Sequence, residues 1–162
     1  MSLTLDQLLV QEQALQFRYF DDDIAWQLGN YLHQLSYERD LSVALEVYVF
    51  DRVVFSSSRI GLTTAQGRSI PIMRNNVLSS GHSSHYLSLF YCSDFTHLSN
   101  RFVGQTAIST QHLSAMGGSF PLKLHNGPLI GAISCVGLAS IDDHNLVVEA
   151  LTHVISRQAL ID

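Results

Sequence analysis

His82 and His85 are spaced as a pair of side chains that could bind a metal. If both lay on a helix, residues three apart would share one face, and their imidazoles could bind a metal ion or a haem iron. The alternative is that His82 and Ser83 serve as helix-capping or hydrogen-bonding residues. Asp94 and His97 repeat the spacing as a weaker pattern. Because the local sequence offers no third ligand, we favour the capping interpretation and assign no metal site.

Gly117 and Gly118 form a second candidate site, because consecutive glycines leave backbone N–H groups open to an anion such as a carboxylate or a propionate. The alternative is a tight bend or bulge before a strand. The Lys-Ser pair of a phosphate-binding loop does not follow them, which favours the bend. Arg74 could pair bidentately with an acidic ligand, or it could face solvent or a neighbouring subunit.

Asp142, Asp143 and His144 combine two carboxylates with an imidazole, the groups used in general acid-base catalysis. Adjacent residues at a helix start point in divergent directions, and carboxylates there satisfy free N–H groups, so capping is the favoured interpretation. Cys135, in an apolar stretch, is typical of a core thiol. The sequence contains no GxSxG, HExxH or Rossmann glycine motif. It therefore contains no recognisable catalytic motif.

These residues must be positioned by helices and strands that the hydrophobic pattern predicts. Thr4 and Asp21 have the capping signals of two helices, and an apolar stripe from residue 24 to 35 follows the second. Period-two alternation predicts a hairpin over residues 42–58. Residues 56–70 are rich in Ser, Thr and Gly and predict a loop that ends at Pro71, in the first turn of a short helix.

The C-terminal half predicts one more helix, a hairpin and a final helix. The earlier helix covers residues 83–95, and residues 94–113 are ambiguous, with room for a further strand. Asn126-Gly127 is a strong turn signal between strands at 120–124 and 129–136, the second of them apolar on both faces and therefore central. Pro121 lacks an N–H and belongs at a strand start or a sheet edge.

The order of these elements predicts an α+β layered domain spanning residues 1–162, with a largely antiparallel sheet of about five strands flanked by helices. Ser140 or Asp142 is expected to cap the last helix, whose apolar face runs from Leu146 to Ile155.

The composition limits the classes of partner. The chain of 162 residues has a net charge of −5 and scattered basic residues, which argues against nucleic acid as a partner. No apolar run approaches the roughly 20 residues of a membrane span, and no secretory signal is visible, so we expect a soluble cytoplasmic protein without a membrane partner. Charged residues make up only 14%, which suggests surface buried between subunits of a homo-oligomer.

The segment MGGSFPLKLHNGPLIGAISCVGLASIDDHNLVVEAL, residues 116–151, resembles the C-terminal signature of the haem-degrading-domain superfamily. GHSS at 81–84 and LLVQEQALQF at 8–17 resemble one branch of it, formed by short single-domain proteins. Residues 64–76 depart from that branch, which carries acidic residues, a Trp and an Arg-Lys pair there. Only Arg74 matches.

This resemblance implies a profilin-like α-β-α fold and assembly into oligomers. It also implies relatives that bind haem or sense redox state, and others encoded with glycolate or corrinoid metabolism. Function resides in sites rather than in folds, so these are expectations only.

Residues and resemblance together predict a binding protein for a small acidic ligand, with haem as the candidate cofactor. We expect the ligand between the helix after residue 70 and the hairpin entry, in a pocket lined by Arg74, His82, Ser83, Gly117, Gly118 and Phe120. The first alternative is an enzyme of small-molecule metabolism acting on a 2-hydroxy acid, a corrinoid or haem, with His82 or His144 as acid-base. The second is a purely structural or partner-binding oligomer.

Overall fold

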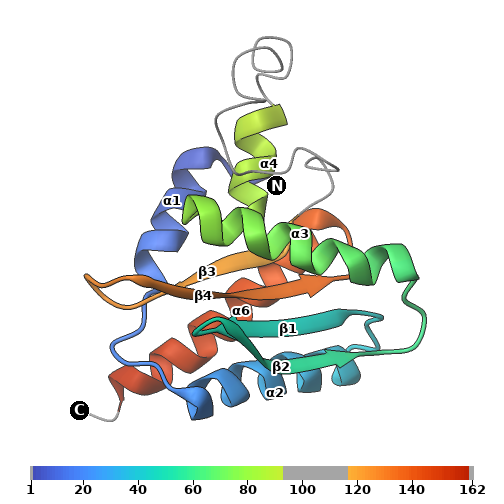
Figure 1. Cartoon of the computed structure of the whole chain (residues 1–162), viewed down its shortest axis with the longest axis horizontal. Helices are drawn as coiled ribbons and strands as arrows, with labels where there is room; N and C mark the ends of the chain where they lie inside the picture. The colour runs from blue at the N-terminus through green and yellow to red at the C-terminus, as the bar shows by residue number, and fades with distance from the viewer. Residues whose placement is uncertain (1, 93–116, 161–162) are drawn as a thin grey trace.

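The computed structural model describes residues 2–92 and 117–160. Within these ranges the chain forms, in order, α1 (Leu5–Ala14), α2 (Asp22–Glu38), β1 (Ala44–Val49), β2 (Arg52–Ser58), α3 (Thr64–Ser80), α4 (Ser84–Cys92), β3 (Ser119–Lys123), β4 (Leu129–Val136) and α6 (Ser140–Ala159) (Figure 1). This order agrees with the α+β arrangement that the sequence predicts.

The sheet contains four strands in the described part of the chain, in the order β2-β1-β4-β3, and every neighbouring pair is antiparallel. The prediction of about five strands exceeds this count by one. The additional candidate fell in residues 94–113, which lie outside the described residues. The central position of β4 is confirmed, and Pro121 lies in the edge strand β3, as its missing N–H requires.

Helices cover both faces of the sheet. Helices α2 and α6 pack on one face, where their apolar stripes and the inward side chains of β1, β3 and β4 form the main core, and α3 lies on the other face over a smaller cluster (Figure 1). At the β3 side, α4 contacts α1, α3, β3 and α6. Sequence segments that are far apart therefore meet around α4.

The start of α3 differs from the sequence prediction. Residues 64–70 were expected in a loop, but α3 begins at Thr64 behind a capping box in which Thr63 and Gln66 satisfy each other's backbone N–H groups. Pro71 consequently lies inside the helix rather than in its first turn. The Thr-x-x-Gln signal outweighed the loop-like composition.

The start of α6 also differs. Its N-cap is Ala139, and neither Ser140 nor Asp142 makes a capping hydrogen bond there. Thr4 and Asp21 do cap α1 and α2 as predicted. No helix among the described residues is both long enough and apolar enough to cross a lipid bilayer.

Candidate functional site

His82 lies in the short link between α3 and α4. Gly81 ends α3 in the left-handed conformation, with φ of 74°, and its N–H donates to the carbonyl of Val77. The Ser83 hydroxyl then accepts the N–H of Tyr86 at 3.2 Å and caps the first turn of α4. His82 therefore precedes the helix that carries His85, and the two imidazoles do not share a helix face.

Glu12 of α1 reaches across to this link and binds both of its residues. Its Oε2 lies 2.7 Å from Nδ1 of His82, and its Oε1 accepts the backbone N–H of Ser83, also at 2.7 Å. The Glu12 side chain is only 5% exposed. Two hydrogen bonds to charge-bearing oxygens compensate the carboxylate for the loss of water.

This contact orients His82. When Nδ1–H donates to Glu12, the neutral ring has its lone pair on Nε2. The His82 side chain is 37% exposed, and its ring stacks on Tyr86 with centroids 4.5 Å apart. Glu12 therefore holds one nitrogen of an accessible imidazole and leaves the other for a ligand.

A second pair of imidazoles, His85 and His144, lies deeper. Their ring centroids are 5.0 Å apart, and the His144 ring also lies beside Phe120. Nδ1 of His85 is 3.4 Å from the Ser140 hydroxyl, and Nε2 of His144 is 2.9 Å from Oε1 of Gln11. Gln11 and Glu12 are neighbours on α1, so this helix contacts both histidine groups.

Burial keeps this pair neutral. It lowers the pKa of His144 to about 3, with a smaller contribution from His85, and it also lowers the pKa of His85. Nδ1 of His144 is buried and has no hydrogen-bond partner among the described residues. Within the same part of the chain, no group of three or more His, Cys, Asp or Glu side chains could hold a metal ion.

Gly117 and Gly118 are buried against the start of α6. A Cβ on Gly117 would collide with Ser140, and one on Gly118 would collide with the Cys135 carbonyl and with Cβ of Asp143 at 2.8 Å. Gly118 also has φ of 119°. The space that we expected these glycines to open for a ligand is therefore filled by the protein itself.

The other predicted site residues divide between the faces of the sheet. Phe120 is 1% exposed and belongs to the core beneath α6. Arg74 extends from α3 on the opposite face, where its Nη1 is 2.6 Å from Glu46 and its guanidinium lies over the Tyr48 ring. Of the six predicted residues, the structure brings His82 and Ser83 together on Glu12, and it places Arg74 in a separate cluster.

Asp143 and His144 point to different partners, as expected for neighbours at a helix start. The Asp143 carboxylate accepts the N–H groups of Gly137 and Leu138 and lies 3.5 Å from the Cys135 thiol. Burial is the main cause that raises its pKa to about 7. Asp143 thus ties the loop after β4 to α6, and Cys135 is a buried core thiol, as predicted.

Sequence reasoning missed Glu12. A signal was present, because Glu12 falls four residues after Leu8 and three before Leu15, within the apolar stripe of the first helix. A carboxylate in such a stripe needs a buried partner. Lys123 was also missed: its Nζ lies 3.7 Å from the position of a Cβ on Gly81, next to His82.

Comparison with known proteins identifies relatives of this chain. The family model of haem-degrading proteins like HbpS matches residues 20–152. A UPF0303 protein of Psychromonas ingrahamii is 35% identical over 94% of this chain and 93% of its own length. A UPF0303 protein of Sinorhizobium medicae is 34% identical over 93% of this chain and 90% of its own.

Solved structures share the fold. The crystal structure of the Ybr137w protein superposes with a TM-score of 0.80 at 20% identity, covering 94% of this chain and 90% of that one. The crystal structure of PduOC in complex with haem gives a TM-score of 0.63 at 15% identity, covering 82% and 93%. At these identities the likeness concerns the fold alone.

Proposed function

Because this chain belongs to the family of haem-degrading proteins like HbpS, we propose that it binds haem, with Nε2 of His82 as the protein ligand to the iron. The observation that carries this proposal is the 2.7 Å contact between Nδ1 of His82 and the buried carboxylate of Glu12. Histidines that bind a metal commonly donate their other ring N–H to a carboxylate, which fixes the tautomer and raises the basicity of the ligand.

The donor set suits haem better than a bare ion. A structural metal ion needs about four protein ligands. The porphyrin supplies four nitrogens itself, so one imidazole is sufficient to hold haem iron. His82 supplies one accessible imidazole at this site, and the described residues contain no group of three or more side chains that could hold a bare metal ion.

The surroundings of His82 also suit the rest of the ligand. Tyr86 stacks on His82, and Phe90 stacks on Tyr86 with centroids 5.9 Å apart, so aromatic rings continue along α4 from the imidazole. An apolar porphyrin face can rest on such rings. The ammonium of Lys123, beside Gly81, is placed to pair with a propionate. Bound haem would supply redox chemistry, and these side chains would bind and orient it.

A titration of the purified protein with ferric haem, followed at the Soret band, tests the proposal. We expect saturation at one haem per chain. His82→Ala should weaken binding by about tenfold or more, because the only proposed protein bond to iron is lost. His125→Ala is the matched control, since His125 is exposed in the β3–β4 turn and should bind haem like the unmodified protein.

The cavity variant His82→Gly extends the test. Added imidazole should restore the Soret position of the unmodified complex if Nε2 of His82 binds iron. A saturable band that is equal in the unmodified protein and in His82→Ala would remove His82 as the ligand. A titration without saturation would overturn haem binding altogether.

We also propose that the protein assembles into a homo-oligomer. The chain is expected to form a homo-oligomer, and its exposed apolar side chains, among them Val10, Tyr37 and Ile60, offer surface for such contacts. Light scattering on the eluting peak of a size-exclusion column measures the mass. A mass of 18.0 kDa, that of one chain, would contradict the expectation.

A further inference from the structure

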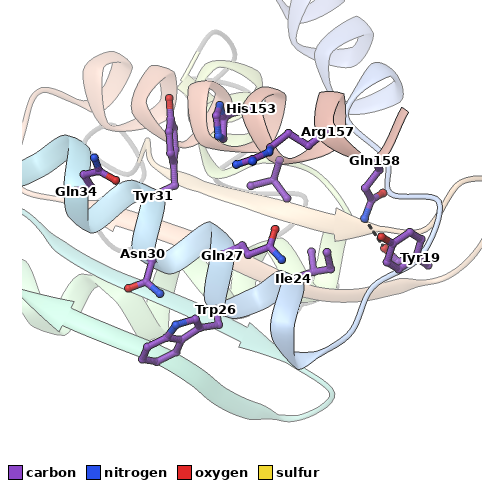
Figure 2. A pocket seen from close by; sticks show the side chains of 11 residues that line it. Tyr19, Ile24, Trp26, Gln27, Asn30, Tyr31, Gln34, His153, Arg157 and Gln158 are labelled. Atoms are coloured by element: carbon purple, nitrogen blue, oxygen red, sulfur yellow. Dashed lines mark hydrogen bonds between the residues drawn. The ribbon is translucent and has the colours of Figure 1, made fainter. Parts of the chain in front are cut away.

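A groove of about 480 Å³ lies between α2 and α6 (Figure 2). Ile24 and Val154 contribute buried apolar side chains, and Tyr31 stacks on His153 with ring centroids 4.0 Å apart. The volume falls within the range of small-molecule sites. His153 and Arg157, on this groove, are nine and thirteen residues beyond His144 on α6, or about 14 and 20 Å along the helix, so the groove is distinct from the His85–His144 pair.

Some polar groups on the groove already have partners. Gln158 accepts the N–H of Arg18 and donates to the carbonyl of Tyr19, which ties the loop before α2 to α6. Gln34 donates to Glu38 on the same helix. These hydrogen bonds hold elements of the fold together, so Gln158 and Gln34 are not candidates for binding a ligand.

Gln27 and Asn30 of α2 and Arg157 of α6 have no hydrogen bond or ion pair from their side chains to any residue in the described ranges. In Figure 2, Gln27 and Arg157 extend from the two helices that border the groove. Each amide offers one donor group and one acceptor oxygen, which is the hydrogen-bonding capacity of a sugar hydroxyl. The guanidinium offers a planar fork of donors.

The charge of the groove is one-sided. Its lining residues include no carboxylate, and Arg157 is its cation. His153 precedes Arg157 by four residues, one turn of α6, so both side chains lie on the same helix face. A phosphate has enough oxygens to accept from a guanidinium and an imidazole together. Walls that mix polar and apolar groups, with an opening to solvent, suit a ligand that has hydroxyl groups as well as an apolar ring face.

We propose that the α2–α6 groove binds a phosphorylated sugar. The phosphate lies against Arg157 and His153, and the sugar hydroxyls bind the amides of Gln27 and Asn30. This site is independent of the haem proposal.

Nuclear magnetic resonance titration of the full chain with glucose 6-phosphate, glucose and inorganic phosphate tests the inference. We expect saturable shifts of amide signals from α2 and α6 with glucose 6-phosphate, at a Kd of about 1 mM, and at least about tenfold weaker binding of glucose or phosphate alone. Arg157→Gln should weaken glucose 6-phosphate about tenfold, and Arg157→Lys less. Gln27→Ala should also weaken it.

Arg68→Gln is the matched control, because Arg68 is exposed on α3, which covers the other face of the sheet. It should bind like the unmodified chain. Equal affinities for glucose 6-phosphate and inorganic phosphate would reduce the groove to an anion site and overturn the sugar assignment. Shifts that do not saturate, or equal affinities of Arg157→Gln and Arg68→Gln, would overturn the site.

Discussion

Oε2 of Glu12 lies 2.7 Å from Nδ1 of His82, although 70 residues separate them in the chain. The carboxylate is buried and the imidazole is partly exposed, so the contact connects the interior of the α1–α4 interface to its surface. The same carboxylate binds the backbone N–H of Ser83. A single side chain from α1 therefore contacts both the backbone of the α3–α4 link and the ring of its histidine.

Glu12→Gln should weaken haem binding by about tenfold. The amide preserves the shape of the side chain but removes the negative charge that makes Nε2 of His82 a stronger ligand to iron. The Soret titration measures this change. Asp6→Asn, an exposed carboxylate on the same helix, is the control and should leave the affinity unchanged. If Glu12→Gln binds haem as tightly as the control, the negative charge of the carboxylate is unnecessary for haem binding.

Arg74→Gln should destabilise the fold by roughly 3 kcal/mol, because it leaves Glu46, whose side chain is only 12% exposed, without its counter-charge. Urea unfolding measures the loss, and Glu46→Gln combined with Arg74→Gln should recover part of it. Haem affinity of the folded single variant should be unchanged, since Arg74 lies over Tyr48 on the α3 face. A loss of haem affinity without a loss of stability would support the ligand-binding role expected from the sequence.

Gly118→Ala should cost about 3 kcal/mol or more, since the new Cβ collides with the Cys135 carbonyl and the backbone has φ of 119°. Gly67→Ala is the opposite case. Gly67 lies in α3 with open space at its Cβ position, so alanine should stabilise the fold by about 0.5–1 kcal/mol. Thermal unfolding of both variants checks the difference, and equal melting temperatures would contradict it.

Two neighbouring residues should give opposite dependences of stability on pH. Burial raises the pKa of Asp143 from 3.8 to about 7, so its contribution to the free energy of unfolding falls as pH rises through that window. Burial lowers the pKa of His144 from 6.5 to about 3, so its contribution falls as pH drops through that window. Between about pH 4 and 6.5 the two effects oppose each other.

Asp143→Asn should therefore expose the effect of His144. Its free energy of unfolding should drop more steeply than that of the unmodified protein when the pH is lowered from 6.5 to 5. Its stability should also be lower at every pH, because the amide nitrogen replaces one of the two carboxylate oxygens and leaves one of the two backbone N–H groups without an acceptor. Urea unfolding at the two pH values measures both changes, and parallel pH curves would show that Asp143 does not titrate in this way.

Local signals predicted most of the elements. Side-chain caps at Thr4 and Asp21 mark helix starts, and the Asn126-Gly127 turn joins two antiparallel strands. These features depend on residues a few positions apart, so they are visible in the sequence. The start of α3 differs from the prediction because the Thr63-Gln66 capping box outweighs the loop-like composition of residues 56–70.

The candidate site was only partly visible. His82 and Ser83 were identified, but Glu12 was not, because a carboxylate on an amphipathic helix does not show which distant residue it meets. The sequence by itself determined the element order and the apolar faces, since these follow from local periodicity. Only the tertiary structure decided that Glu12 meets His82 and that α6 fills the space beside Gly117 and Gly118, because the approach of α1 to α4 and of α6 to β3 results from burying those apolar faces against a shared sheet.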